Sequence, residues 1–321
     1  MLSEVLPALF QQVKKISPCS HAMRAFFFPS IMPIQWELVG PSERRGMNSN
    51  ASSGYEICYL DKINSPDIAP DVTAVYAVSL SGGLASAISA ERVIQRYGRE
   101  NTLLWFADTL YEDEDLYRFL CDCMTRWGGA LYWYTDGRTP LEVAAQKKLI
   151  PCNLAAPCSY ELKVKPFRQF ILAMPSLPVV YIGLDRWEKR RLISVKESYA
   201  KAIPAAFVDY PLLWEPYEAR PFTDVCRQDW QIDPPRLYSL GFTHNNCGGR
   251  CVRQGIKEWV RLGMHFPERY QACEDWEQEQ RAHGGARAKR SFCAVQRDGI
   301  KQPLPLIDIR AQYFDHRETL F

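Results

Sequence analysis

The sequence predicts an α/β fold, with a doubly wound, mostly parallel sheet covered by helices on both faces. Two observations lead to this prediction. Apolar runs of strand character alternate with stretches of helical spacing between residues 75 and 212, and a two-glycine turn ends the first run. With 321 residues, 47% of them hydrophobic, the chain can bury a substantial core.

The first predicted strand, residues 75–80, leads into Ser81-Gly82-Gly83 and a helix over residues 84–97. Glycines let the backbone approach phosphate oxygens, and a helix start presents unpaired N–H groups at the positive end of its dipole. The turn therefore predicts anion binding, with an ordinary strand-to-helix turn as the alternative.

The remaining elements follow in alternation. Further strands are predicted at residues 102–108, 130–134, 179–184 and 206–212, and further helices at residues 112–127, 160–173 and 187–194. In sheets of this kind ligands bind at the carboxyl ends of the strands, where the glycine turn lies. Near the C-terminus, Asp298-Gly299 between two apolar runs predicts a hairpin.

Three regions are expected along the chain. Residues 1–70 are interrupted by prolines and a polar run, so we predict a loosely ordered lead-in without chemistry. Residues 71–215 form the nucleotide-binding α/β domain, and residues 216–321 a helical, cysteine-containing extension packed on it.

Composition narrows the class of protein. The formal net charge of +2 gives no indication of a nucleic-acid or membrane partner. No apolar run approaches the roughly 20 residues that a helix needs to span a bilayer. The N-terminus lacks the charge order of a secretion signal, so the eleven cysteines indicate reduced thiols or metal ligands in a cytoplasmic protein.

SGGLAS resembles the PP-loop S-G-G-x-D-S of the ATP pyrophosphatases and phosphoadenosine-phosphosulfate (PAPS) reductases, in the adenine nucleotide alpha hydrolase-like superfamily. Ser81, Gly82, Gly83 and Ser86 match the motif, and Ala85 replaces its aspartate. The resemblance implies that the four matching residues hold the phosphates of ATP or PAPS. Ala85 puts a magnesium role for that position in doubt.

The second strand ends in FADT, which resembles the strand end of the same family. The resemblance implies that Asp108 holds the nucleotide ribose or Mg²⁺. Helix capping is the alternative reading, and we favour it for Glu112, Asp113 and Asp115 in the expected first helical turn.

CSYELKVKP, beginning at Cys158, resembles the C-x-x-x-x-K-x-x-P segment of these reductases. The resemblance implies that Lys163 approaches nucleotide or sulfate oxygens. Together with Lys165 and Arg168 it forms a basic patch suited to an anion, unless the three side chains make a solvated helix face.

IGLDRWEKRR loosely resembles the family segment I-G-x-R-x-x-E-S-x-x-R, with Asp185 at the position of the first arginine. We predict that Arg186 and either Arg190 or Arg191 contact phosphate or sulfate, because the planar guanidinium suits such oxygens. Charge pairing along a helix is the alternative for Arg191.

HNNCGGRCVRQG places Cys247 and Cys251 in a glycine-rich turn. Three readings stay open. The pair could join Cys158 and Cys152 around a [4Fe–4S] cluster, as in some relatives; it could bind zinc with His244; or one thiol could carry sulfur or act as a redox nucleophile.

The leading hypothesis is an ATP-dependent enzyme that adenylates a substrate oxygen and releases pyrophosphate in sulfur transfer. Lys163, Arg186 and Cys158 are the candidate catalytic residues, and a sulfur-donor protein and a nucleic-acid acceptor are candidate partners. One alternative is a sulfonucleotide reductase, although the family's C-terminal E-C-G-[IL]-H motif is absent from the sequence. Another is a non-catalytic nucleotide- or nucleic-acid-associated module, which Ala85 favours.

Overall fold

The computed structural model of the chain describes residues 32–35, 76–153, 155–297 and 299–314. They form two compact units that interleave along the chain. Unit 1 holds the described residues up to Ala107 together with residues 115–134 and 169–234, and unit 2 holds residues 108–114, 135–168 and the described residues from 235 onward. The sequence predicts contiguous domains instead. Of the predicted lead-in, only residues 32–35 are described.

Unit 1 is built on a six-stranded sheet in the order β1-β4-β3-β2-β5-β6. Five of its strands run parallel and β1 is antiparallel to β4, which confirms the predicted α/β class with a mostly parallel sheet. The strands are β1 (Met32–Gln35), β2 (Tyr76–Leu80), β3 (Thr102–Asp108), β4 (Ala130–Thr135), β5 (Val179–Ile182) and β6 (Val208–Asp209).

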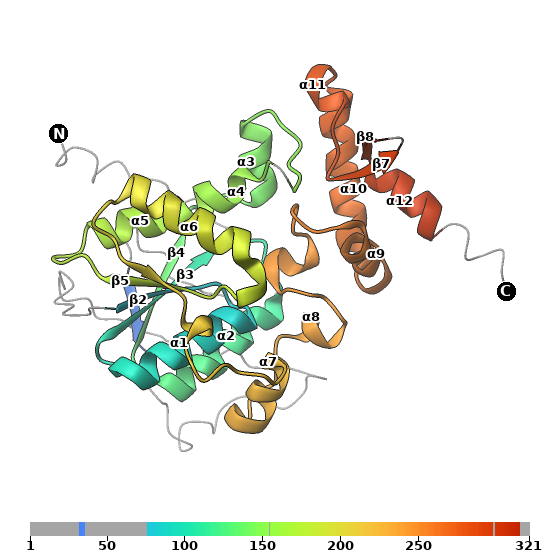
Figure 1. Cartoon of the computed structure of the whole chain (residues 1–321). Coiled ribbons are helices and arrows are strands. Elements are labelled where there is room, and N and C mark those ends of the chain that lie inside the picture. The colour runs from blue at the N-terminus through green and yellow to red at the C-terminus, as the bar shows by residue number, and fades with distance from the viewer. Residues whose placement is uncertain (1–31, 36–75, 154, 298, 315–321) are drawn as a thin grey trace, which may run out of the picture. The chain divides into compact units, whose positions relative to one another are not determined.

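Helices cover both faces of this sheet. Figure 1 shows α1 (Leu84–Tyr97) and α2 (Glu114–Trp127) on one side, and α5 (Lys165–Leu172) and α6 (Lys189–Ala202) on the other. All seven residues of β3 are buried, as expected for a strand enclosed on both faces. The shorter helical elements of unit 1 are Arg186–Glu188, Pro211–Leu213, α7 (Phe222–Asp224) and a π-helical segment at Val225–Trp230.

The predicted elements recur with shifted ends. The predicted helix at 160–173 is split into a π-helical turn, Tyr160–Val164, and α5. The predicted helix at 187–194 begins only at Lys189 and continues to Ala202, after the 3₁₀ turn Arg186–Glu188. Strand β1 was not predicted; it contains Pro33, which a sheet tolerates because this strand lies at the edge.

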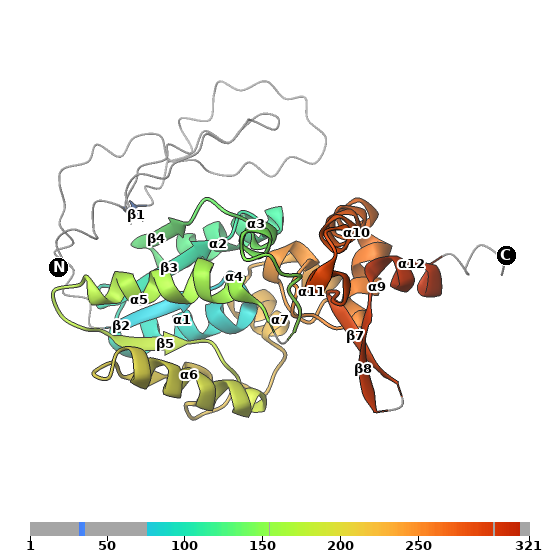
Figure 2. The ribbon, with the colours of Figure 1, turned by 90° about the horizontal axis from the view of Figure 1, so that it is seen from above.

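Unit 2 is helical, with a two-stranded hairpin that projects from the helical group in Figure 2. The hairpin, β7 (Cys293–Arg297) and β8 (Ile300–Leu304), confirms the turn predicted at Asp298-Gly299, although Asp298 itself is not described. Trp259 stacks on Phe292 in the core. The other helices are α3 (Pro140–Gln146), α4 (Pro157–Ser159), α8 (Arg236–Ser239), a 3₁₀ segment Asn246–Gly249, α9 (Ile256–His265), α10 (Pro267–Ala282), α11 (Gly285–Ala288) and α12 (Leu306–Tyr313).

Candidate functional site

The predicted phosphate turn lies at the point of unit 1 where the direction of strand order reverses. The chain proceeds from β2 to β3 and β4 on one side of β2, and then places β5 and β6 on its other side. Crevices at such reversal points, outside the carboxyl ends of the strands, are where open α/β sheets bind ligands. Ser81, Gly83 and Ala85 are half-buried, so part of the turn remains accessible.

Two glycines allow close approaches here, one to a side chain and one to backbone. Gly82 has a left-handed φ of +75°, and a Cβ on it would lie 2.6 Å from Cγ of Leu116. Gly183, just beyond β5, was not among the predicted site residues. A Cβ on Gly183 would lie 2.7 Å from Cα of Ser86 and 2.8 Å from the carbonyl oxygen of Ala85. The end of β5 therefore passes directly against the first turn of α1.

The Ser86 hydroxyl braces the turn from within. Its Oγ accepts the backbone N–H of Ser81 at 3.0 Å and donates to the carbonyl of Gly83 at 2.8 Å, and it lies 3.0 Å from Oγ of Ser81. The helix begins after Gly83, whose backbone is extended. These bonds give both serines a structural role, and a phosphate contact for either stays a prediction.

A second cluster forms in unit 2 around the Glu112 side chain, which has no exposed surface. Its Oε1 accepts the Thr109 hydroxyl at 2.9 Å and lies 3.1 Å from Nζ of Lys163, in the π-helical turn. Its Oε2 accepts the backbone N–H of Cys247 at 2.6 Å. One carboxylate thus joins three segments that are far apart in the sequence.

The expectation that Glu112 lies in the first turn of a helix is wrong, because α2 begins only at Glu114, and Asp113 directly precedes that helix. Asp113, also without exposed side-chain surface, pairs with Arg236 at 2.8 Å and Arg269 at 2.7 Å. Only Asp115 behaves as expected, in the first turn of α2, where it pairs with Arg118. Residues 112–115 are all acidic, which is more negative charge than the start of one helix needs. This run was the feature of the sequence that could have indicated contacts with distant segments.

The loop that carries Cys247 is left-handed. Cys247 and Gly248 have φ of 54° and 58°, and Gly249 has φ of 79°. A cysteine adopts this conformation at a cost, and such residues persist where the surroundings hold them, often at functional sites. The bond from the Cys247 N–H to Glu112 is one such restraint.

Cys247 and Cys251 form a hydrogen-bonded pair in which the pKa of one thiol is raised and that of the other is lowered. The Cys247 thiol donates to Cys251, and this bond, with help from His244, the Arg253 backbone N–H and Lys163, lowers the Cys251 pKa to about 6 despite burial. The same bond and burial raise the pKa of Cys247 well above its usual range. The negative charge of this pair is therefore favoured on Cys251, with the Cys247 thiol beside it.

Lys163 supplies positive charge to this pair. Burial alone would lower the pKa of Lys163, but Glu112, Cys247 and Cys251 raise it above its ordinary value, so the amine stays charged. Arg250, close to the pair in the sequence, lies 3.6 Å from the ring centre of Tyr111.

The structure brings together three of the four cysteines proposed as cluster ligands. Burial and the neighbouring Cys251 raise the pKa of Cys158, so it is a protonated thiol. The backbone of Cys152 pairs with that of Ala155, and its thiol adds to burial and Glu277 in raising the pKa of Cys293.

Among the described residues, no group of three or more His, Cys, Asp or Glu has the arrangement of a metal site. A [4Fe–4S] cluster takes four cysteine thiolates, and a cluster on these four cysteines stays a prediction. We therefore derive no step through a cluster or zinc.

The remaining predicted residues make contacts of their own. Oδ1 of Asp108, which is buried, accepts the N–H of Leu110 at 2.8 Å, a local turn of the capping kind. Arg186 is exposed and lies over the rings of Trp187 and Tyr217. Arg191 forms an ion pair with Glu188, as expected if its role is charge pairing along the helix. Nucleotide contacts by these residues stay predictions.

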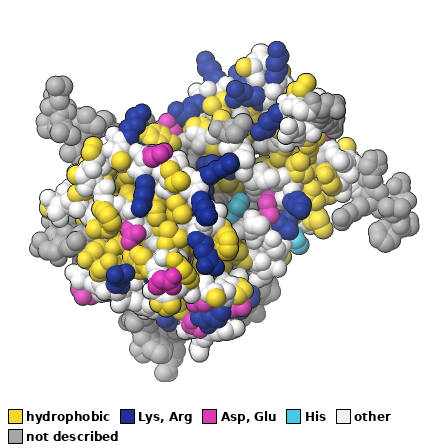
Figure 3. Space-filling view, in the orientation of Figure 1, with side chains coloured by type: hydrophobic (Ala, Val, Ile, Leu, Met, Phe, Trp, Pro, Cys, Tyr) yellow, Lys and Arg dark blue, Asp and Glu magenta, His cyan; other side chains and the backbone are white. Residues whose placement is uncertain are grey.

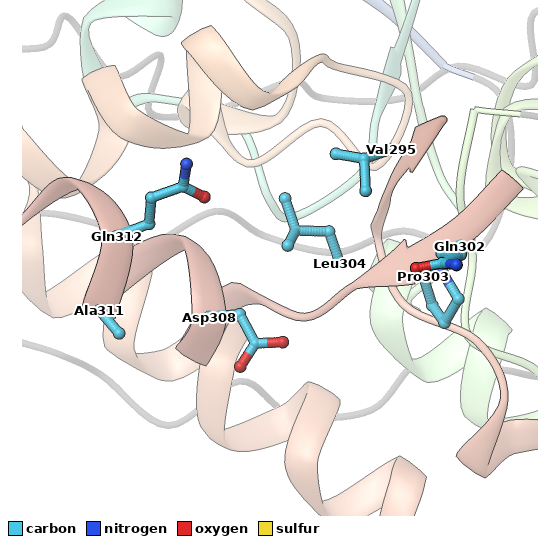
Figure 4. Close-up of a pocket in the computed structure, with 7 residues that line it drawn as sticks. All are labelled: Val295, Gln302, Pro303, Leu304, Asp308, Ala311 and Gln312. Atoms are coloured by element: carbon cyan, nitrogen blue, oxygen red, sulfur yellow. The ribbon is translucent and has the colours of Figure 1, made fainter. Parts of the chain in front are cut away.

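A pocket in unit 2 has none of the predicted site residues in its lining. It is bounded by the hairpin β7–β8 and by α12, and Figure 4 shows Asp308 as its one acidic side chain. Its lining residues are Val295, Gln302, Pro303, Leu304, Asp308, Ala311 and Gln312.

No protein-family model matches the chain, and no curated protein matches it significantly in sequence. Within the described part of the chain, no helix has the length and apolar character needed to cross a membrane.

Proposed function

We propose that the chain is a PP-loop enzyme of the PAPS-reductase-like kind, which uses ATP to adenylate an acceptor oxygen, with release of pyrophosphate, in sulfur transfer. One observation supports this above all: the Ser81–Ser86 turn follows the central strand at the reversal point, with the backbone of Gly183 packed against it. A helix start on a glycine turn at that position is suited to a chain of phosphates.

In this reaction the acceptor oxygen attacks the α-phosphorus of ATP. The bond between the α-phosphorus and its bridging oxygen breaks, and pyrophosphate leaves with the electron pair. Negative charge develops on the leaving group, and the N–H groups at the start of α1 are suited to stabilise it. Asp108 and Arg186 are candidate nucleotide contacts; Lys163 acts in the proposal through the thiolate, because Glu112 holds its ammonium group.

In the proposed reaction, Cys251 of unit 2 carries the sulfur. Its thiolate can take the outer sulfur of a persulfide on a donor protein, releasing the donor thiolate and leaving a persulfide on Cys251. The terminal sulfur then attacks the adenylated carbon, and AMP leaves with the C–O bond electrons. Cys247 attacks Sγ of Cys251, which frees the thiolated product and forms a Cys247–Cys251 disulfide. A dithiol reductant restores both thiols.

Sulfonucleotide reduction is the second candidate, and the Cys247–Cys251 pair favours it. A thiolate attacks the sulfur of PAPS and releases adenosine 3′,5′-bisphosphate. The neighbouring thiol then attacks Sγ of that cysteine, releasing sulfite and forming a disulfide. The pair supplies both groups, with Cys251 as the attacking thiolate and Cys247 as the resolving thiol.

Two assays on the full-length chain separate the candidates. Pyrophosphate release from ATP, measured alone and with RNA, DNA or a persulfide donor, identifies the adenylating enzyme. Sulfite formation from PAPS with a dithiol donor identifies the reductase. We expect Gly183→Ala to abolish pyrophosphate release and Cys251→Ser to spare it while stopping sulfur transfer. Nucleotide binding without either reaction would contradict both candidates and leave a binding module.

A further inference from the structure

An exposed aromatic and arginine stack lies in unit 1, three residues beyond Gly183. The guanidinium carbon of Arg186 is 4.8 Å from the ring centre of Trp187 and 5.3 Å from that of Tyr217. Trp187 follows Arg186 in the 3₁₀ turn after β5, whereas Tyr217 comes from the loop after Pro211–Leu213. Two separate segments therefore meet around one cation.

The two rings are not used as core. Trp187 is 77% exposed and Tyr217 is 44% exposed, and Trp187 is the most exposed large hydrophobic side chain in the described part of the chain. Leaving an indole in water forgoes the burial that normally stabilises it. Flat aromatic faces held beside a guanidinium are the features on which nucleobases stack.

The segment that carries Trp187 has an excess of positive charge, whereas Tyr217 is flanked by Glu215 and by Glu218, which pairs with Arg220. From Asp185 to Ala202 the chain has six Lys or Arg and three acids. Glu188 is occupied locally: it pairs with Arg191, and its Oε2 accepts the N–H of Asp185. Lys189 and Arg190 are exposed and make no ion pair with any described residue. Figure 3 shows Lys and Arg side chains over the face on which α6 lies.

We propose that Trp187 and Tyr217, held by Arg186, stack an unpaired nucleobase of single-stranded nucleic acid, and that Lys189 and Arg190 contact the adjoining phosphates. The inference goes beyond the proposed function, which needs no nucleic acid. The stacking chemistry would also suit the base of a free nucleotide. Basic side chains beyond the stack favour a strand, because they extend the positive charge along the first turn of α6.

The test is binding of a fluorescently labelled twelve-nucleotide oligothymidylate to the full-length chain, followed by anisotropy at low salt. Trp187→Ala should weaken binding about tenfold, since stacking contributes at that level for each base. Trp187→Phe should restore most of the affinity. Phe207→Ala is the matched control, because Phe207 is an exposed aromatic of the same unit at 64% exposure and lies outside the stack.

Three further arms identify the ligand. Lys189→Ala and Arg190→Ala should each reduce the slope of log affinity against log salt by about 0.7. A duplex of equal length should bind more weakly than the strand, and the two Trp187 variants should leave ATP affinity unchanged. Equal losses in Trp187→Ala and Phe207→Ala, or equal strand and duplex affinity, would overturn the proposal.

A loss of ATP affinity in Trp187→Ala that matches its loss of strand affinity would assign the stack to a free nucleotide and overturn the strand assignment. Pyrophosphate release from ATP is measured on the same proteins. Its absence in the wild type, combined with Trp187-dependent strand binding, would remove the proposed function and leave this inference standing.

Discussion

Ser81, Gly82, Gly83 and Ser86 are neighbours in the chain, and their turn is closed by bonds among themselves. The cluster in unit 2 is built differently, because one buried carboxylate joins Thr109, Lys163 and the loop of Cys247. A contiguous turn can be recognised from its residues, whereas a cluster assembled across some 140 positions depends on the fold. The two regions should therefore respond differently to substitution.

The largest effect is expected in the cluster. Glu112→Gln leaves the Lys163 ammonium without its carboxylate and removes one acceptor for buried donors, so we expect the free energy of unfolding to fall by about 2–3 kcal/mol. Urea unfolding followed by circular dichroism measures it. Glu114→Gln is the control, because Glu114 is 81% exposed, and it should change stability by less than about 0.5 kcal/mol. Equal effects of the two substitutions would show that Glu112 does not hold the cluster together.

The turn is expected to lose function more than stability. Gly183→Ala forces a Cβ against the backbone of Ser86, so we expect a cost of about 1–3 kcal/mol and displacement of the start of α1. Nucleotide binding should then be lost, as measured by calorimetry. Gly255→Ala is the matched control, because a Cβ there meets no atom within 4 Å. Retained binding in Gly183→Ala would separate the turn from nucleotide recognition.

The thiol pair gives a pH-dependent prediction. Because the Cys251 pKa is lowered to about 6, its alkylation rate should rise with pH through about 6 and level off by pH 8. Cys247→Ala removes the donated hydrogen bond and should move this midpoint upward by about one unit, whereas Cys247→Ser keeps a hydroxyl donor and should move it less. Peptide mass spectrometry after iodoacetamide treatment reports each site. Cys226, whose pKa burial raises to about 12, serves as an internal control that should stay unmodified. A Cys251 midpoint near 8.5 in the wild type would contradict the pairing.

These contrasts also explain which features the sequence could predict. The strand at residues 102–108 was predicted at the bounds the structure gives, because a continuous apolar run with a turn at each end has few alternatives. Gly183 was missed as a site residue, since its importance comes from Ser86 approaching it across the sheet. Glu112 and Asp113 were taken for helix caps, because their partners Lys163 and Arg269 lie about 50 and 150 residues away.

The smallest effect is expected at Arg191. It is 61% exposed and pairs with Glu188 on the first turn of α6, so Arg191→Ala should change the free energy of unfolding by less than about 0.5 kcal/mol. Thermal unfolding of the variant beside the wild type checks this. The same variant tests the predicted phosphate contact, because a loss of ATP affinity in Arg191→Ala would show that Arg191 contacts the nucleotide.

In the proposed function, the turn between β2 and α1 holds the phosphates of a nucleotide. Calorimetric titration of the full-length chain with ATP, repeated in the presence of inorganic pyrophosphate or adenosine, tests it most directly. We predict one ATP site that pyrophosphate blocks and adenosine does not. ATP binding that pyrophosphate leaves untouched would contradict the account.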